Sequence, residues 1–424
     1  MISKKTFKFT QVFGDKQFST NVSEPDVITA LSFEKQGRLL AIGDESGRLI
    51  VFEQSIAKNS SRKFPEYKYL TEWQSHLREF DYLKSVDIHE RITGIEWLES
   101  SGKGKFILAT NEKKIRLWKL SDRKITISEK IPQRDKFTLR SLPLPLLRTV
   151  DGCSFPSLKR TFATHHNFHI HSISASPDGE SFISSDELRI NLWNLENPAI
   201  TFNILDIKPR NIDDVTEVIT KSKFHPFDDC KFIYATNKGC VCLGDLRENS
   251  KLINNVLKFE NSFNQDLNAF REVTSSISDA SISPDGRFIY ARDYLSIKIW
   301  DVNNPSRPLN TVKLYDASSA KLRQLYENDS MLDQFSVEVS PCSKYVVTGG
   351  YNNQFQVVDK RGKRRTAYEV NFNRKTMANN LAKDQHELFP NTIHNHQKIL
   401  KTAWNPSSDC LAVANANCLF FFHA

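Results

Sequence analysis

The fold is decided by one stretch, ISDASISPDGRFIYARDYLSIKIWDV, which spans residues 277–302. A short alternating run leads into a Pro-Asp-Gly turn, a second apolar run, an acidic turn and a third run that ends in Trp300-Asp301. Alternation with a period of two is typical of β-strands, and Pro-Asp-Gly is a turn signal. The stretch therefore predicts three antiparallel strands joined by two tight turns.

The same order of strands and turns occurs seven times in the 424 residues. The second clear copy is IHSISASPDGESFISSDELRINLWNL, residues 170–195, and five weaker copies occupy residues 29–53, 93–120, 218–247, 335–360 and 399–423. The copies start roughly 50 to 75 residues apart, which exceeds the usual WD-repeat period and implies insertions in the fourth strands and their loops. The repeat predicts an all-β fold, a seven-bladed WD-repeat β-propeller in a single domain over residues 1–424.

The copies also predict blade boundaries. We expect blades near residues 27–72, 86–164, 165–205, 215–262, 273–316, 332–372 and 397–424. A blade without a partner would leave an open strand edge, and residues 6–13 (TFKFTQVF) alternate like a strand, so we expect them to close the ring in the last blade. Residues 122–160 are too long to fold back under blade 2, so they predict a projecting hairpin arm.

Composition excludes several classes of protein. Hydrophobic residues make up 39% and charged residues 25%, which is ordinary for a globular chain, and no apolar run is long enough to span a membrane. The seven cysteines are scattered and form no CxxC pair, so we expect reduced thiols and a protein of the cytoplasm or the nucleus. A net charge of +8 is modest for this length and does not require nucleic acid as a partner.

Two further motifs leave alternatives open. The histidine-rich run (His165, His166, His169, His171) could hold a metal, but no ligand set is complete, so loop-bracing is favoured and no metal or cofactor is expected. The basic run KRGKRR at residues 360–365 fits a nuclear-import or phosphate-binding patch, but a solvated charge run in a hairpin turn is favoured.

Several segments resemble the B-type, fifty-five-kilodalton regulatory subunit of protein phosphatase 2A. Residues 73–92 read WQSHLREFDYLKSVDIHERI, which is similar to a block of that family that no general WD-repeat rule produces. Other matches appear in the family's order from the first blade to the last: DELRINLW (186–193), FNILDIKP (202–209), TEVIT (216–220), RDYLSIKIW (292–300), LYEND (325–329), GYNN (350–353) and ILKTAWNP (399–406).

The resemblance implies a non-catalytic subunit that joins a HEAT-repeat scaffold subunit and a metal-dependent Ser/Thr phosphatase catalytic subunit, and that selects phosphoprotein substrates. It also implies that the blade 2 arm docks on the scaffold, in line with the apolar character of the arm sequence. The residues expected to dock are Gln74, His76, Glu79, Phe80, Asp81, Tyr82, Lys84, Leu139, Leu142, Leu144, Leu146 and Leu147. The alternative is a loop that is disordered or packed under the propeller.

Acidic residues gather in the turns between second and third strands and in the connections between blades. In a WD-type propeller these segments share one face, so we expect an acidic surface that attracts phosphosites with basic flanks. Its expected residues are Glu24, Asp44, Glu45, Asp186, Glu187, Leu188, Ile212, Val215, Tyr326, Glu327 and Asp329. The resemblance favours Asp186, Glu187 and Leu188 with Ile212 and Val215, whereas Glu45 and Gln334 stand where relatives often have Lys. For each carboxylate, capping of its own turn is the alternative.

Two other functions remain as alternatives. A general WD-repeat scaffold for another assembly would leave residues 74–84 unexplained. An enzyme would need catalytic groups around the channel, and the sequence has no GxSxG, HExxH, P-loop or paired-glycine dinucleotide motif.

Overall fold

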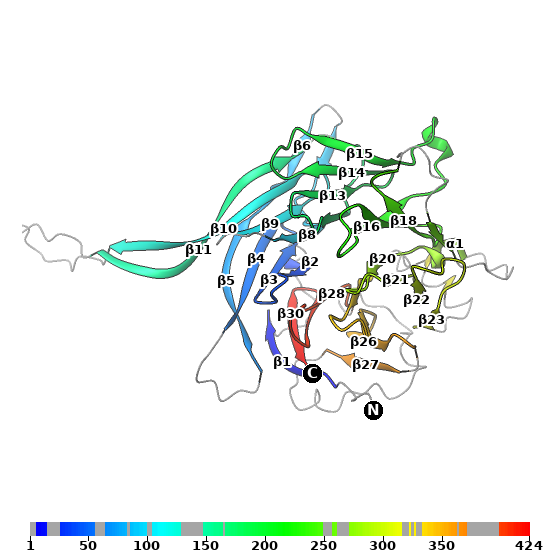
Figure 1. Ribbon diagram of the computed structural model, residues 1–424. Helices are drawn as coiled ribbons and strands as arrows, with labels where there is room; N and C mark the ends of the chain where they lie inside the picture. Colours follow the sequence, from blue (N-terminus) through cyan, green and yellow to red (C-terminus); the bar gives the residue numbers. More distant parts are fainter. Residues whose placement is uncertain are drawn as a thin grey trace, which may run out of the picture.

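The computed structural model describes residues 6–14, 26–55, 64–82, 85–99, 104–128, 147–163, 166–248, 257–260, 271–315, 322–323, 326–327, 333–362, 364–370 and 398–424. Within residues 123–153 and 271–272 it describes the backbone alone. In this part of the chain, seven four-stranded antiparallel sheets surround a central axis (Figure 1). The predicted seven-bladed, all-β propeller with a projecting hairpin is confirmed.

The first four blades, each given from its innermost strand outward, are the following. Blade 1 contains β2 (Ile28–Phe33), β3 (Leu39–Asp44), β4 (Arg48–Ser55) and β5 (Glu66–Gln74). Blade 2 contains β8 (Gly94–Leu98), β9 (Lys105–Thr110), β10 (Ile115–Ser128) and β11 (Leu147–Phe162). Blade 3 contains β12 (Ser172–Ala175), β13 (Ser181–Ser185), β14 (Arg189–Asn194) and β15 (Thr201–Asp206). Blade 4 contains β16 (Ile219–Phe224), β17 (Lys231–Thr236), β18 (Val241–Asp245) and β19 (Leu257–Phe259).

The remaining blades follow the same order. Blade 5 contains β20 (Asp279–Ile282), β21 (Phe288–Arg292), β22 (Ser296–Asp301) and β23 (Asn310–Lys313). Blade 6 contains β24 (Val337–Val339), β25 (Tyr345–Thr348), β26 (Gln354–Asp359) and β27 (Arg365–Glu369). Blade 7 contains β28 (Lys401–Trp404), β29 (Cys410–Asn415), β30 (Cys418–His423) and, from the other end of the chain, β1 (Lys8–Phe13). Outside the blades lie the hairpin of β6 (Glu79–Asp81) and β7 (Val86–Ile88), the 3-10 helix η2 (Ile212–Asp214) and helix α1 (Arg271–Ser275).

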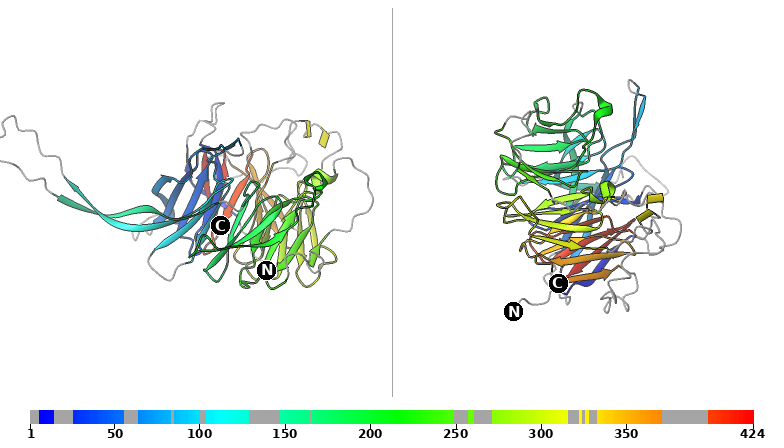
Figure 2. Two further views of the ribbon diagram at one scale, coloured as in Figure 1. Left: turned by 90° about the horizontal axis from the view of Figure 1, so that it is seen from above. Right: turned by 90° about the vertical axis from the view of Figure 1, so that its right-hand side faces the viewer.

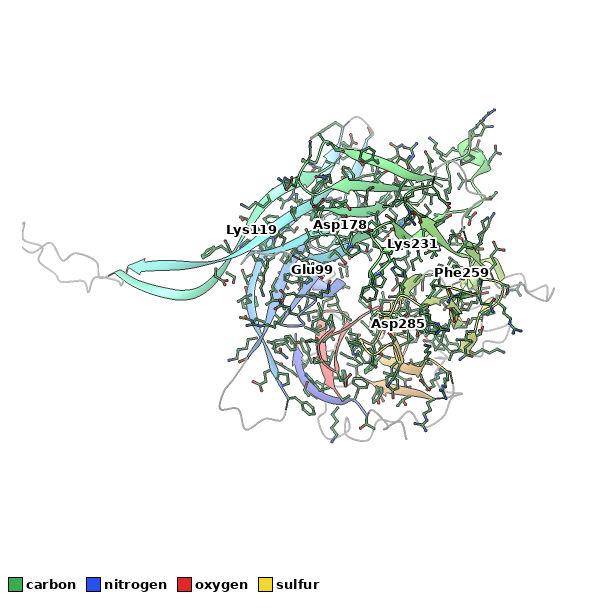
Figure 3. The ribbon with its side chains drawn as sticks, in the orientation of Figure 1. Glu99, Lys119, Asp178, Lys231, Phe259 and Asp285 are labelled. Atoms are coloured by element: carbon green, nitrogen blue, oxygen red, sulfur yellow. The ribbon has the colours of Figure 1, made fainter. Side chains whose placement is uncertain are left out.

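The Pro-Asp-Gly turns join the first and second strands of blades 3 and 5. Gly179 and Gly286 adopt φ of 72° and 71°, in the left-handed region that favours glycine. Asp178 accepts hydrogen bonds from the backbone N–H groups of Glu180 (2.8 Å) and Ser181 (3.2 Å). Figure 3 shows Asp178 and Asp285 towards the middle of the ring, whereas Phe259 on an outermost strand lies near its edge. The sharp turns therefore reverse the chain, so that the second strand pairs antiparallel with the first.

The apolar residues pack between blades. Seven clusters of buried hydrophobic side chains occur among the described residues, and each joins two adjacent blades. The cluster between blades 7 and 1, for example, stacks Tyr67 on Phe421 with ring centroids 4.5 Å apart. Because burial of apolar area is the main driving force for folding, each blade depends on both of its neighbours.

The N-terminal strand completes blade 7. β1 pairs with β30 in antiparallel register from Lys8 opposite His423 to Phe13 opposite Leu419. Its Gln11 also exchanges two hydrogen bonds with the backbone of Tyr67 in blade 1, at 2.7 and 2.9 Å. The two ends of the chain thus meet at the same seam (Figure 1).

The arm is an extension of the two outer strands of blade 2. β10 continues beyond Trp118, where the repeat pattern places the end of the third strand, to Ser128. It stays paired with β11 from Ile115 opposite Phe162 to Ser128 opposite Leu147. Seen edge-on, the hairpin leaves the side of the ring (Figure 2).

We predict that Phe7→Ala weakens the ring at its seam. Phe7 is buried and makes edge-to-face contacts with Tyr368 (5.9 Å between centroids) and Trp404 (5.6 Å). Its loss should lower the free energy of unfolding by about 3 kcal/mol, measured by denaturant titration. Lys8→Ala on the exposed side of β1 is the matched control and should behave like wild type. Equal stability of Phe7→Ala and wild type would contradict this account of the closure.

Candidate protein-interaction surfaces

The acidic turns share one end of the propeller. In an antiparallel four-stranded blade, the turn between second and third strands lies at the end where the first strand starts and the fourth strand finishes. The connections between blades lie at that end too, together with the turns that carry Asp44, Asp186 and Asp293. We call this end the acidic face.

The three turn aspartates are buried and hold their own turns. Each accepts hydrogen bonds from backbone N–H groups that follow it in the chain. The donors are Arg48 for Asp44 (2.7 Å), Leu188 and Arg189 for Asp186 (2.9 and 2.7 Å), and Leu295 and Ser296 for Asp293 (2.9 and 2.5 Å). These side chains build the acidic face rather than forming its exposed surface.

Asp186 also ends a buried chain of side-chain contacts through blade 3. His166 Nδ1 lies 2.9 Å from Asp186 Oδ2, and His166 Nε2 lies 2.6 Å from Ser184 Oγ. Trp193 Nε1 donates to the same Ser184 oxygen at 2.7 Å. Burial alone would raise the pKa of Asp186, but the hydrogen bonds from His166, Leu188 and Arg189 lower it below its usual value. The chain fixes the connection into blade 3 against the second turn of that blade.

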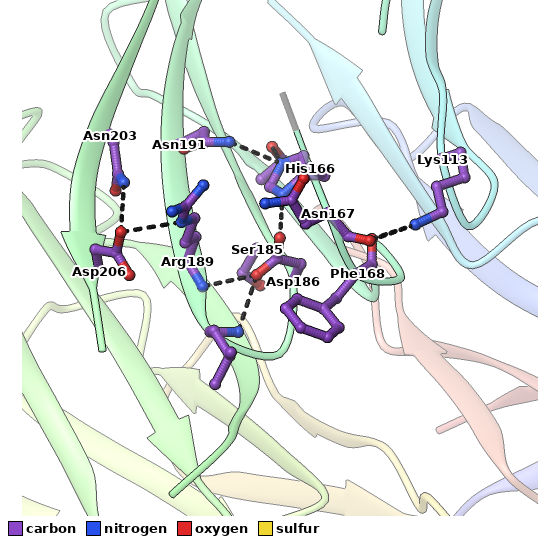
Figure 4. Close-up of polar contacts among 12 residues, drawn as sticks. Lys113, His166, Asn167, Phe168, Ser185, Asp186, Arg189, Asn191, Asn203 and Asp206 are labelled. Atoms are coloured by element: carbon purple, nitrogen blue, oxygen red, sulfur yellow. Dashed lines mark hydrogen bonds and ion pairs between the residues drawn. The ribbon is translucent and has the colours of Figure 1, made fainter. Parts of the chain in front are cut away.

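This network continues into blade 2 and the outer part of blade 3. Lys113 Nζ donates to the carbonyl oxygens of Asn167 (2.8 Å) and Phe168 (3.2 Å), and Arg189 pairs with Asp206 at 3.0 Å (Figure 4). Neighbouring turns are therefore held in fixed positions relative to one another.

Exposed groups surround these buried anchors. Glu187 and Val215 are half-buried, while Ile212, Asp213 and Asp214 of η2 are exposed. The backbone connects them, because the carbonyl of Glu187 accepts a hydrogen bond from Ile219 N (2.8 Å) at the start of blade 4. Burial raises the pKa of Glu187. A carboxylate beside exposed apolar and acidic groups can contact a basic, partly apolar segment.

The other residues expected on this face lie further around the ring. Glu45 is half-buried, burial raises its pKa, and its carboxylate pairs with Arg91 at 3.3 Å. Tyr326 and Glu327 are exposed, whereas Leu188 is buried. Glu24 and Asp329 lie outside the described residues.

The block at residues 74–82 has an inner and an outer half. Gly47 adopts a φ of 80°, and a Cβ there would lie 2.5 Å from the carbonyl oxygen of His76, so glycine permits the close approach of this segment. His76 is buried, its Nε2 lies 3.2 Å from Lys114 O, and burial lowers its pKa to about 3. Gln74 Nε2 donates to Ser46 O at 2.6 Å. The inner half thus fixes the block to blades 1 and 2.

The outer half presents apolar side chains to solvent. Tyr82 is 85% exposed and Phe80 46% exposed, and their rings lie 5.0 Å apart. Val86 on β7 and Leu77, just before β6, are also exposed. A patch of large apolar side chains on a protruding hairpin is typical of a protein-binding site.

Charged groups attach this hairpin to blade 2. Glu79 pairs with Lys114 and, at 3.9 Å, with Arg116, both on or just before β10. Asp81 is half-buried in β6, and Lys84 lies outside the described residues. In the arm, Leu139, Leu142, Leu144 and Leu146 also lie outside the described residues, and Leu147 begins β11 without a described side chain. Phe155 and Leu158 on β11 are exposed.

Two structural links were not predicted from the sequence. Ser75 is buried and its Oγ accepts a hydrogen bond from Trp118 Nε1 at 2.9 Å, while its carbonyl accepts from Arg116. The second link is the chain of His166, Asp186, Ser184 and Trp193. The sequence contains a pattern that could have predicted this second link. A histidine before the first strand, an aspartate in the second turn and a tryptophan in the third strand can meet within one blade.

Thiols and carboxylates elsewhere in the ring were also candidates for chemistry. The six described cysteines, namely Cys230, Cys240, Cys242, Cys342, Cys410 and Cys418, are free thiols. Among the described residues, the one group with metal-ligand spacing is Asp228, Asp229 and Cys230, on a surface turn where Asp228 pairs with Lys231 at 2.9 Å. No helix in the described ranges is both long and apolar enough to cross a membrane.

Comparison with known proteins gives consistent similarities. Residues 156–194 match the family "WD domain, G-beta repeat", from the end of β11 through β14. The chain is 39% identical to a Schizosaccharomyces pombe protein named as the B regulatory subunit of protein phosphatase PP2A, over 98% of this chain and 97% of that protein. It is 42% identical to a protein of the same name from Candida tropicalis, over 82% of this chain and 70% of that protein.

We predict that Asp186→Ala destabilises the propeller by about 2–3 kcal/mol, because buried donors lose their acceptor. The pKa of Asp186 is depressed in the folded protein, so its contribution is present above the unfolded-state pKa and is lost as pH falls through the folded-state pKa. The stability difference between variant and wild type should therefore shrink in acid, measured by denaturant titration at several pH values. Glu196→Ala, exposed on the same blade, is the control. A pH-independent difference would show that the carboxylate's charge is not what stabilises the turn.

Proposed function

The chain belongs to the family of B-type regulatory subunits of protein phosphatase 2A, and from that premise we propose that it recruits substrates to the phosphatase through two separate surfaces. The acidic face binds phosphoproteins with basic residues around the phosphosite. The arm and the β6–β7 hairpin dock on the HEAT-repeat scaffold subunit, which also carries the catalytic subunit. The chain itself is regulatory and not catalytic.

The observation that carries this proposal is that the arm and the acidic turns lie on different sides of the ring. The β6–β7 hairpin connects blade 1 to blade 2 at the acidic-face end, where Glu79 pairs with Lys114 and Arg116 at the start of β10. The arm leaves the side of the ring (Figure 2), while the strand order places the acidic turns at one end of it. A protein that binds a scaffold with one surface can therefore hold a substrate with the other. The rigid ring between them fixes their relative position, as a recruiting subunit requires.

On the docking side, the exposed apolar groups favour a protein partner. Phe80 and Tyr82 protrude from β6–β7, and Phe155 and Leu158 are exposed on β11. Aromatic side chains of this kind contribute much of the binding energy of protein interfaces. We propose that this set forms the inner part of the scaffold contact, with Leu139, Leu142, Leu144, Leu146 and Leu147 further along the arm.

On the substrate side, the half-buried and exposed groups are better placed for direct contact than the buried aspartates. We propose that Glu187, Ile212, Val215, Asp213 and Asp214 touch the substrate, and that Asp186 and Leu188 position this turn. Carboxylates on a fixed surface raise the encounter rate with basic segments in a salt-dependent way.

We predict that Phe80→Ala combined with Tyr82→Ala weakens scaffold binding at least tenfold, roughly the loss of one interface hot spot. The measurement is biolayer interferometry of the purified chain on immobilised scaffold. Phe227→Ala removes another exposed aromatic ring, which lies on the β16–β17 turn away from the arm, and should bind like wild type. Unchanged binding of the double variant would exclude the β6–β7 hairpin from the interface.

We also predict that reversing Glu187, Asp213 and Asp214 to Lys slows dephosphorylation of basic phosphopeptides by the assembled phosphatase, because attraction becomes repulsion. The trimer should still assemble, which size-exclusion chromatography checks. Glu180→Lys makes the same kind of change on the opposite face and serves as control. Equal rates for reversed and wild-type trimers at low salt would reject the substrate assignment.

A further inference from the structure

A charged cavity lies in the centre of the ring. The first strands of the blades contact one another around the axis and enclose about 250 Å³, lined by residues from all seven blades. Its charged and titratable lining groups are three lysines, three carboxylates and one histidine: Lys221, Lys223, Lys401, Glu96, Asp279, Glu338 and His171. This is far more room than a single water needs.

The lining forms two layers. Every second residue of a strand points to the same side, so Lys221 and Lys223 of β16 line successive layers. Lys401 and Asp279 begin β28 and β20, and first strands start at the acidic face. Lys221, Asp279 and Lys401 therefore belong to the layer nearer that face, and Glu96, Lys223 and Glu338 to the deeper one.

The carboxylates in the cavity already have partners. Asp279 accepts hydrogen bonds from Ala280 N (3.0 Å) and Val337 N (2.8 Å) and lies 3.7 Å from Lys221 Nζ. Glu338 lies 3.9 Å from Lys223. Burial raises the pKa of Glu96 to about 7, so near neutral pH this carboxyl is partly protonated.

Lys401 has no such partner. Among the residues that the structure describes, its ammonium group makes no hydrogen bond or ion pair. The pKa of Lys401 is lowered to about 8, mainly by burial. The cations of Lys221 and Arg91 also lower this pKa, and together they outweigh Asp279, which raises it. His171 also lines the cavity but supplies no negative charge for Lys401. Burial lowers the pKa of His171 to about 4, so its ring is neutral near neutral pH. Lys401 is half-buried in the channel wall, and a partly desolvated cation next to other cations is costly without a counter-ion.

We propose that Lys401 and Lys221 bind a phosphate group at the acidic-face end of the central channel. Lysine ammonium groups bind phosphate as point charges. The cavity lining also includes Ser336 and Thr402, whose hydroxyl groups bond each other at 3.1 Å. A dianion there supplies the missing counter-charge.

The phosphate can be free or attached to a phosphoserine. The second source rests on the proposed function, since a phosphosite with basic flanks would place its anion over the lysines and its flanks over the acidic face. The proposal of a phosphate site does not depend on that function.

The test uses the purified full-length chain and isothermal titration calorimetry with inorganic phosphate and with sulfate. We expect saturable binding at one site by wild type, and at least tenfold weaker binding by Lys401→Met, roughly the loss of one charge-assisted contact. Lys238→Met removes an exposed lysine from another turn of the acidic face and should bind like wild type. Lys221→Gln is a second variant that should also lose affinity.

Folding and selectivity are checked in the same experiment. Phosphate should raise the thermal unfolding temperature of wild type and Lys238→Met but not of Lys401→Met. Sulfate does not titrate in this range, so its affinity should fall as pH rises through about 8, where Lys401 loses its proton. No saturable binding by wild type, equal binding by Lys401→Met, or displacement by chloride at concentrations equal to sulfate would overturn the proposal.

A second arm identifies the source of the phosphate. A basic phosphoserine peptide should bind wild type more tightly than its unphosphorylated form, and Lys401→Met should abolish the difference. If inorganic phosphate binds but peptide phosphorylation makes no difference, the ligand is the free anion. The Glu187, Asp213 and Asp214 reversal should weaken both peptides while leaving inorganic phosphate binding intact, so failure of the substrate face and failure of the phosphate site are separable.

Discussion

Every other feature of this protein depends on the closure of the ring. No blade has a core of its own, because the apolar side chains pack between neighbouring blades. A row of such blades would expose an apolar surface at each end. The pairing of β1 with β30, reinforced by the hydrogen bonds between Gln11 and Tyr67, joins those ends. Only a closed ring can hold turns from different blades in fixed positions, so the acidic face, the channel and the base of the arm all rely on this seam.

Within the closed ring, the role of a polar side chain depends on how deeply it is buried. Asp44, Asp186 and Asp293 are buried and organise their turns, whereas Glu187, Asp213 and Asp214 face outwards. Residues 74–82 show the same division. Buried Ser75 attaches to Trp118 of β10, while Phe80 and Tyr82 protrude. In both places a rigid inner contact supports an exposed outer group. This arrangement reduces the entropy that a binding surface loses when its partner docks.

The sequence predicted the fold well because strand alternation and turn residues are local signals. Trp300, the Pro-Asp-Gly turn and the alternation of residues 6–13 can all be recognised in the sequence without tertiary information. Burial is not local. Asp186 and Glu187 are adjacent acidic residues in one turn, and only packing distinguishes the buried Asp186 from the half-buried Glu187. The channel was equally hidden, because Lys221, Asp279 and Lys401 are far apart in the chain and meet only when seven first strands converge. The substrate and scaffold contacts of these surfaces remain predictions.

The seam also constrains how the chain is made. Lys8 is translated before its partner His423, and the residues of blades 1 to 6 lie between them in the sequence. Earlier blades can pair their own strands during synthesis, but blade 7 cannot be completed until β30 has been translated. Throughout that time β1 has no partner, and blade 1 lacks the neighbour that covers Tyr67. A nascent chain of this kind exposes apolar surface and a free strand edge, the two features that make partly folded chains prone to aggregation.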